Sequence, residues 1–148
     1  MTIEMALSRM AAFCSKGEHC ESEVREKLQK ATMTAAAINS IVARLYDEHY
    51  LDTSRYCRAF ARDKLLFVHW GRIKIAQALR MKGLPQADIS DALVELPAVE
   101  YDSILSALLA QKARTLHDED EYIRRGKLIR FALGRGFTME EVTRMIDE

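Results

Sequence analysis

The chain has 148 residues with 22 basic and 22 acidic side chains, so its formal net charge is zero. Apolar residues make up 49% of it and charged residues 30%, which is an ordinary profile for a soluble protein. No apolar run approaches the roughly 20 residues that a transmembrane helix needs, so we expect no membrane partner. A chain of this length buries roughly 68–70% of its unfolded surface, which excludes a need for disulfides or metals in stability.

The scarcity of chain breakers indicates an all-α fold, since only two prolines and six glycines occur and strand-type alternation is hard to find. Three cysteines, Cys14, Cys20 and Cys57, make an odd number, and no signal peptide is recognisable, so we expect a reducing cytoplasm. Cys14, His19 and Cys20 lack a clear fourth ligand and match no common zinc spacing. We therefore expect no metal or other cofactor.

Three amphipathic helices are predicted in the first third of the chain. The first covers about residues 4–14 and the second about 21–30, with acidic residues at its start and lysines near its end, as the helix dipole favours. The third begins after Thr34, whose hydroxyl can cap the unpaired amides of the first turn. The side chains expected to face the core are Leu7, Met10, Ala11, Val24, Leu28, Ile38, Ile41, Val42 and Leu45.

Two basic helices joined by a short aromatic turn follow over residues 50–83. Asp52 can cap the first helix, and the second covers about residues 70–82 and ends at Gly83. Helical spacing places three aromatic residues on one narrow face of the first helix, namely Tyr56, Phe60 and Phe67. Asp63 falls in the same stripe, so we expect it to pair with a basic residue of a neighbouring helix.

The charge of this region is strongly segregated. Residues 55–82 carry eight basic side chains and one acidic side chain, a net charge of +7, so the rest of the chain sums to −7. Such segregation predicts a basic surface that faces an anionic partner, either nucleic acid or an acidic protein groove.

Two helices flanked by prolines come next. Pro85 suits the first position of one helix, and Pro97 separates it from another over about residues 98–116. The side chains expected inside are Ile89, Ala92, Leu93, Leu96, Ile104, Leu105, Leu108 and Leu109.

The last two predicted helices begin with capping-box spacings, Asp118 with Glu121 and Thr138 with Glu141. The side chains expected inside are Tyr122, Leu128, Ile129, Ala132, Leu133, Val142, Met145 and Ile146.

An internal repeat organises these helices. When three leucines are set in register, each is followed by a short polar link, an apolar residue, a helix starter and a second apolar residue. These positions hold Leu28, Met33, Thr34 and Ile38; Leu79, Leu84, Pro85 and Ile89; and Leu133, Phe137, Thr138 and Val142. The third link is one residue shorter than the first. The sequence predicts three tandem three-helix units, residues 1–48, 49–96 and 97–148, stacked in an elongated, curved array.

The central unit resembles the signature of the RecX family. The residues that carry the resemblance are Tyr50, Leu51, Asp52, Arg55, Tyr56, Ala59, Phe60, Lys64, Trp70, Gly71, Ile75, Leu79, Lys82 and Gly83. The flanking units resemble a variant found in one branch of the family. Two departures are Thr53, where many members have a second acidic residue, and the turn at residues 67–70, where many have a glycine.

The resemblance implies three tandem three-helix repeats, in agreement with the internal repeat. It also implies a cytoplasmic regulator in recombination, DNA repair and the SOS response, which binds along the filament that RecA forms on single-stranded DNA. Family members commonly inhibit the ATPase and strand-exchange activities of that filament. No catalytic residues come with the family, so we expect a non-enzymatic monomer whose partner is the RecA filament.

Basic residues on the helix surfaces are the candidates for contact with this partner, because arginine forks bind carboxylates and phosphates in a bidentate way. The candidate partner- or DNA-binding residues are Arg55, Arg58, Arg62, Arg72, Lys74, Arg80, Lys82, Arg124, Lys127 and Arg130. Trp70 is assigned to a position between helices rather than to base stacking. No phosphate loop, nucleophile elbow or paired carboxylates occur, so no catalytic residue is predicted. The alternative function is a stand-alone nucleic-acid-binding module that contacts phosphates without a protein partner.

Overall fold

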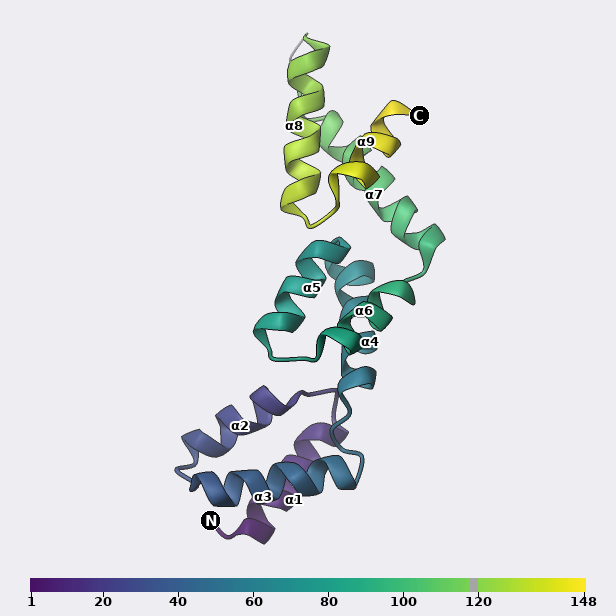
Figure 1. The fold of residues 1–148 in the computed structure, drawn as a ribbon. Helices are drawn as coiled ribbons and strands as arrows, with labels where there is room; N and C mark the ends of the chain where they lie inside the picture. The colour runs from purple at the N-terminus through teal and green to yellow at the C-terminus, as the bar shows by residue number, and fades with distance from the viewer. Residues whose placement is uncertain (118–119) are drawn as a thin grey trace.

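The computed structural model describes residues 1–117 and 120–148, which form nine α-helices and one π-helical turn but no strand. The elements are α1 (Ile3–Ser15), α2 (Glu21–Lys30), α3 (Ala35–Asp47), α4 (Thr53–Asp63), η1 (Lys64–Val68), α5 (Arg72–Met81), α6 (Gln86–Val94), α7 (Ala98–Ala113), α8 (Glu121–Gly134) and α9 (Met139–Asp147). They form an elongated molecule with the two termini at opposite ends (Figure 1). The predicted all-α array of three-helix repeats is confirmed, while the unit boundaries stay a prediction.

Short polar side chains begin several helices as the sequence indicated. The side chains of Thr34, Asp52 and Thr138 accept hydrogen bonds from the opening turns of α3, α4 and α9. Pro85 is the N-cap of α6 rather than its first helical residue. Asp118 lies outside the described residues, and the N-cap of α8 is Asp120, whose carboxylate accepts from two backbone amides.

The turn after the second helix of each repeat is built in the same way three times. A backbone amide donates to the carbonyl five residues earlier, and the residue before that amide has a positive φ, which is the Schellman arrangement. The amides and carbonyls are Met33 and Leu28, Leu84 and Leu79, and Phe137 and Ala132, at 3.2, 3.1 and 3.2 Å. The residues with positive φ are Thr32 (58°), Gly83 (84°) and Gly136 (97°).

These turns correct the repeat register. Ala132 is 2% exposed and occupies the place of Leu28 and Leu79, whereas Leu133 is 40% exposed. The prediction that Leu133 lies inside and that the third link is shorter is therefore wrong. The error arises because alanine gives a weaker apolar signal than the leucine beside it.

The π-helical turn η1 changes which side chains of the α4 region face the core. A π-turn adds a residue to the helical period, so it shifts every later side chain around the axis. Leu65 is completely buried, while Phe67 is 78% exposed. The predicted aromatic stripe is therefore wrong at Phe67, and Asp63 is exposed without an ion pair to any residue that the structure describes.

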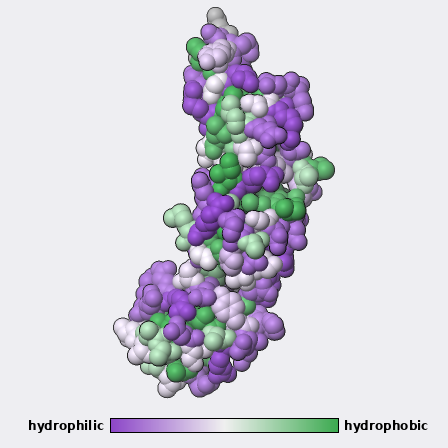
Figure 2. Space-filling view, in the orientation of Figure 1, coloured by the Kyte–Doolittle hydropathy of each residue, from purple (hydrophilic) through white to green (hydrophobic). Residues whose placement is uncertain are grey.

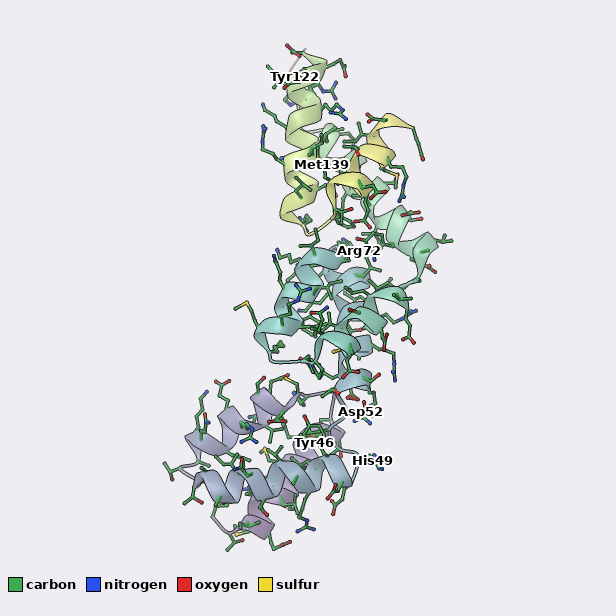
Figure 3. All side chains as sticks on the ribbon, viewed as in Figure 1. Tyr46, His49, Asp52, Arg72, Tyr122 and Met139 are labelled. Atoms are coloured by element: carbon green, nitrogen blue, oxygen red, sulfur yellow. The ribbon has the colours of Figure 1, made fainter. Side chains whose placement is uncertain are left out.

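Tyr122 is also exposed, contrary to prediction. It is the second residue of α8 and lies at the free end of the molecule, where no neighbouring helix covers it (Figure 3).

The buried side chains form two hydrophobic clusters. One joins α4 to α9 continuously and also takes in Cys20 from the start of α2. The other is confined to α1–α3 and the segment that leaves them, which includes Leu51. The second and third repeats therefore share one core, while the first repeat has its own. None of the described helices is long and apolar enough to cross a membrane.

Replacing Thr32 with glycine should stabilise the fold. A β-branched residue at φ 58° is strained by about 1 kcal/mol, and glycine removes that strain, as it does in the other two repeats. We expect a rise of this size in the free energy of unfolding, measured with urea. Gly83→Ala is the matched control and should lower the free energy of unfolding. Its added Cβ would meet no atom within 4 Å, so only the backbone conformation is penalised. A destabilised Thr32→Gly variant would contradict the assignment.

Candidate partner-binding surface

Arg55, a predicted binding residue, is tied to the boundary between the first and second repeats. Its Nε donates to both carboxylate oxygens of Glu18, at 2.7 and 3.0 Å. One of its terminal nitrogens donates to the carbonyls of His49 and Tyr50. The guanidinium therefore holds two repeats together and has little capacity left for a partner.

Glu23 collects donors from both sides of the same boundary. The Tyr56 hydroxyl donates to it at 2.9 Å, the Cys20 amide at 3.3 Å and the His19 ring nitrogen at 3.0 Å, while the Lys82 ammonium lies 3.9 Å away. Burial alone would raise the pKa of Glu23, but the hydrogen bonds from His19, Cys20 and Tyr56 outweigh it and lower that pKa to about 2. The carboxylate is therefore charged at neutral pH and links the two repeats.

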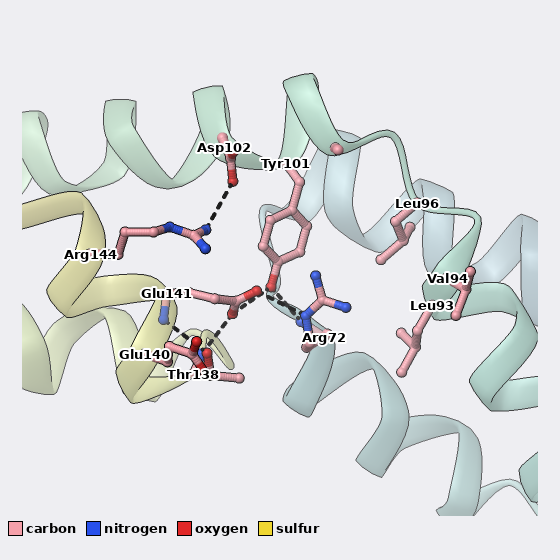
Figure 4. A pocket seen from close by; sticks show the side chains of 11 residues that line it. Arg72, Leu93, Val94, Leu96, Tyr101, Asp102, Thr138, Glu140, Glu141 and Arg144 are labelled. Carbon is pink, nitrogen blue, oxygen red and sulfur yellow. Dashed lines mark hydrogen bonds and ion pairs between the residues drawn. The ribbon is translucent and has the colours of Figure 1, made fainter.

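Glu141 plays the corresponding part between the second and third repeats (Figure 4). The Nε of Arg72 donates to it at 2.9 Å, the Tyr101 hydroxyl at 3.0 Å and the Thr138 amide at 2.8 Å. The guanidinium of Arg72 also lies over the Tyr101 ring, 4.7 Å from its centre. Burial of Glu141 opposes its ionisation, yet these donors lower its pKa below the usual range. The predicted binding residue Arg72 is thus half-buried and engaged by a carboxylate of the same chain, where the two repeats meet.

Backbone hydrogen bonds also join the second and third repeats. The amides of Gly71 and Ile73, at the start of α5, donate to the carbonyls of Arg135 and Gly136 at 2.8 and 2.9 Å. A Cβ on Gly71 would come within 2.6 Å of the backbone of Gly136, so only glycine permits this approach.

Several other predicted cations have weaker partners. Arg58 bonds to Ser54 and lies 3.7 Å from Glu95, and Arg124 lies 3.8 Å from Glu121. The exposed pair of Arg58 contributes little to stability, so this arginine remains available to a partner, whereas Arg124 is half-buried. In α8, Lys127 is half-buried and Arg130 is exposed.

Four cations of the basic segment have no carboxylate within ion-pair distance in residues 1–117 and 120–148. They are Arg62, Lys64, Lys74 and Arg80. Arg80 instead donates to the side-chain oxygen of Gln86 at 2.9 Å. The net +7 of the segment is therefore divided between structural cations and these four.

Lysines and aromatic rings alternate along one side of the second repeat. Lys64 lies 5.3 Å from the centre of the Phe60 ring and 4.9 Å from that of Trp70. Lys74 also lies 4.9 Å from the centre of a Trp70 ring, and Lys82 is 5.9 Å from that of Phe60. We call these five residues the lysine–aromatic strip. Both rings are only partly buried, so the strip combines positive charge with accessible aromatic surface.

The other repeats carry related arrangements. Lys112 and Arg135 lie 5.4 and 5.3 Å from the centre of the Phe131 ring, and Lys27 lies 4.7 Å from that of Phe13. Lys82 and Arg135 are the C-caps of α5 and α8, but Lys82 faces a ring of α4 while Arg135 faces a ring of its own helix.

Sequence reasoning missed Lys64 as a binding residue, although it lies one helical turn after Phe60, a spacing that brings two side chains together. Trp70 and Lys74 have the same four-residue spacing, whereas η1 separates Lys64 from Trp70, so no spacing in the sequence indicated that second contact. No group of three potential metal ligands occurs in the part of the chain that the structure describes.

Proteins that resemble this chain over most of its length carry the name regulatory protein RecX. A family model described as the second three-helix domain of RecX matches residues 54–93, and one for the third three-helix domain matches residues 100–146. Regulatory protein RecX of Prosthecochloris aestuarii is 30% identical over 145 residues, which cover 97% of this chain and 92% of the relative. Regulatory protein RecX of Leuconostoc mesenteroides is 24% identical, and the chain spans about half its length (55%).

Solved structures show the same fold. A crystal structure of regulatory protein RecX superposes with a TM-score of 0.89 at 24% identity, covering 99% of this chain and 72% of the other. The crystal structure of RecX from Lactobacillus salivarius gives a TM-score of 0.87 at 19% identity, covering 98% and 94%.

Replacing Arg72 with methionine should destabilise the protein by about 2 kcal/mol, because the buried Glu141 carboxylate loses its cation. The measurement is the free energy of unfolding in urea. Arg62→Met is the matched control, since Arg62 is exposed and has no such pair, and it should change the stability by less than about 0.5 kcal/mol. Equal effects of the two substitutions would show that Arg72 is not structural.

Glu23 should make stability depend on acid pH. Its pKa in the folded state is about 2, below its ordinary value of 4.5, so its contribution is present above pH 4.5 and is lost as the pH falls toward 2. The free energy of unfolding should therefore fall over this range, and Glu23→Gln should flatten the decline. Glu26→Gln, at an exposed position of the same helix, should leave it unchanged. The prediction is contradicted if the free energy of unfolding of both variants falls with decreasing pH as steeply as that of the wild type.

Proposed function

The chain belongs to the RecX family, and we propose that it is a non-enzymatic, monomeric regulator of the RecA recombinase. In this proposal it binds the filament that RecA forms on single-stranded DNA and inhibits its ATPase and strand-exchange activities. Regulation of the SOS response follows, because that response depends on the active filament. The cytoplasm is the compartment where such a partner would be met.

The observation that carries the proposal is the lysine–aromatic strip. The ammonium groups of Lys64 and Lys74, which have no carboxylate partner among the described residues, suit carboxylates or phosphates, and the rings offer flat surfaces for stacking. A nucleoprotein filament presents both kinds of group, namely acidic protein side chains and a polyanionic strand. The strip therefore matches this partner better than it matches an uncharged protein surface.

The elongated array supports the same partner. Cation–aromatic pairs occur in all three repeats, so contacts can be distributed along the molecule. A long, periodic partner can meet all of them at once, and the combined affinity then exceeds that of a single repeat. The contacts within the two boundaries hold these pairs in a fixed order.

Removing both free lysines of the strip should weaken regulation. We expect Lys64→Ala with Lys74→Ala to raise the concentration needed for half-maximal inhibition of RecA ATP hydrolysis about tenfold, which corresponds to about 1.4 kcal/mol. Lys30→Ala is the control, because Lys30 is exposed on the first repeat and pairs only with Glu26. An unchanged ATPase rate and no co-sedimentation of the wild-type protein with filaments would refute the proposal.

A second candidate is a stand-alone nucleic-acid-binding module, which the strip's partly exposed rings also favour. It requires affinity for DNA without RecA and a steep loss of binding with salt, since each phosphate contact releases counterions. A salt titration with labelled single- and double-stranded DNA separates the two functions. Binding that needs RecA supports the regulator, and equal binding without RecA supports the module.

A further inference from the structure

A groove opens where α6 and the start of α7 face α9, on a part of the surface that does not include the lysine–aromatic strip (Figure 4). Its volume is about 470 Å³. One wall is apolar and consists of Leu93, Val94 and Leu96, while the opposite wall carries charged side chains. The groove is therefore amphipathic.

The apolar wall continues onto open surface. Val94 is 83% exposed, and Val99, in the first turn of α7, is 77% exposed. Figure 2 shows hydrophobic surface at the corner where α6 meets α7. Two valines this exposed, beside the half-buried Leu93 and Leu96, form an apolar patch that nothing in the described chain covers.

The charged wall has an excess of carboxylates. Both of its arginines already face acids of the same chain, Arg72 with Glu141 at 2.9 Å and Arg144 with Asp102 at 3.9 Å. Glu140 is exposed and has no ion pair with any described residue. A ligand that enters the groove therefore meets an unneutralised negative charge.

The segment that forms part of the groove is also rich in acidic residues, which adds to the negative charge. Residues 86–102 contain five carboxylates and no lysine or arginine, in contrast with the net +7 of residues 55–82. A nucleic-acid strand would be repelled here, and an acidic peptide would be as well. The complementary ligand is cationic and carries apolar side chains.

We propose that this groove is a second docking surface, which receives a basic amphipathic segment of a partner protein. An apolar side chain of that segment packs among Leu93, Val94 and Leu96, and a lysine or arginine lies beside Glu140 and Asp102. The surface goes beyond the proposed function, because it requires neither RecA nor DNA. It would allow the protein to hold a basic protein segment while the strip contacts an anionic partner.

The test uses a synthetic amphipathic helical peptide of leucine and lysine, with a leucine–glutamate peptide of the same spacing as its counterpart. We expect the lysine peptide to bind and to shift the backbone NMR signals of Val94 and Glu140. Val94→Ser should weaken binding about fivefold by removing apolar contact, and Glu140→Lys about tenfold by reversing the local charge. Met81→Ser is the matched control, since Met81 is equally exposed but lies on α5.

Three results would overturn the proposal. One is the absence of binding, or equal binding of the glutamate peptide. Another is signal changes confined to residues outside the groove. The third is self-association of the wild-type protein in sedimentation that Val94→Ser abolishes, which would make a second copy the occupant. The Lys64→Ala, Lys74→Ala variant should bind the peptide normally, so failure here and failure of the proposed function can be told apart.

Discussion

A partly buried carboxylate links the repeats at each boundary. Glu23 accepts a hydrogen bond from the Tyr56 hydroxyl and pairs with the Lys82 ammonium, both from the next repeat. Glu141 accepts hydrogen bonds from Arg72 of the preceding repeat and from Tyr101. A partly buried carboxylate is tolerated only when donors surround it, so these groups must stay in place together. The relative orientation of three small helical units follows from this requirement, because none of the units alone has a large core.

The same requirement divides the positive charge of the molecule into two roles. Arg55, Arg72 and Lys82 face acids across the boundaries and serve the architecture. Lys64 and Lys74 have no carboxylate partner in residues 1–117 and 120–148, and their ammonium groups lie over aromatic rings at the surface. The composition gives a net charge of zero, yet the fold sorts its charges so that a cationic strip and an acidic, apolar groove coexist on one chain. Overall neutrality is therefore a poor guide to what this protein can bind.

The sequence predicted what local chemistry determines. Thr34 and Asp52 cap helices because a short polar side chain reaches amides within the next turn, and the repeat showed itself in spacings of a few residues. Prediction from the sequence failed where the position of a side chain depends on a residue far along the chain or on an irregular turn. Arg72 meets a carboxylate 69 residues away, which no periodicity encodes, and η1 moved Phe67 off the predicted face. The candidate binding residues stay a prediction, and the structure shows that Arg55 and Arg72 among them are engaged by acids of the same chain.

The close approach of Gly71 to Gly136 has a mechanical consequence. Main-chain hydrogen bonds and a shared core join α4–α9 into one unit. In contrast, α1–α3 are attached to this unit mainly through polar side chains. The boundary near Asp52, which lies between the two parts, is therefore less constrained than the boundary between the second and third repeats (Figure 3). A change of angle at this boundary leaves the contacts of Lys64 and Lys74 with Trp70 intact, because all three residues lie within the second repeat.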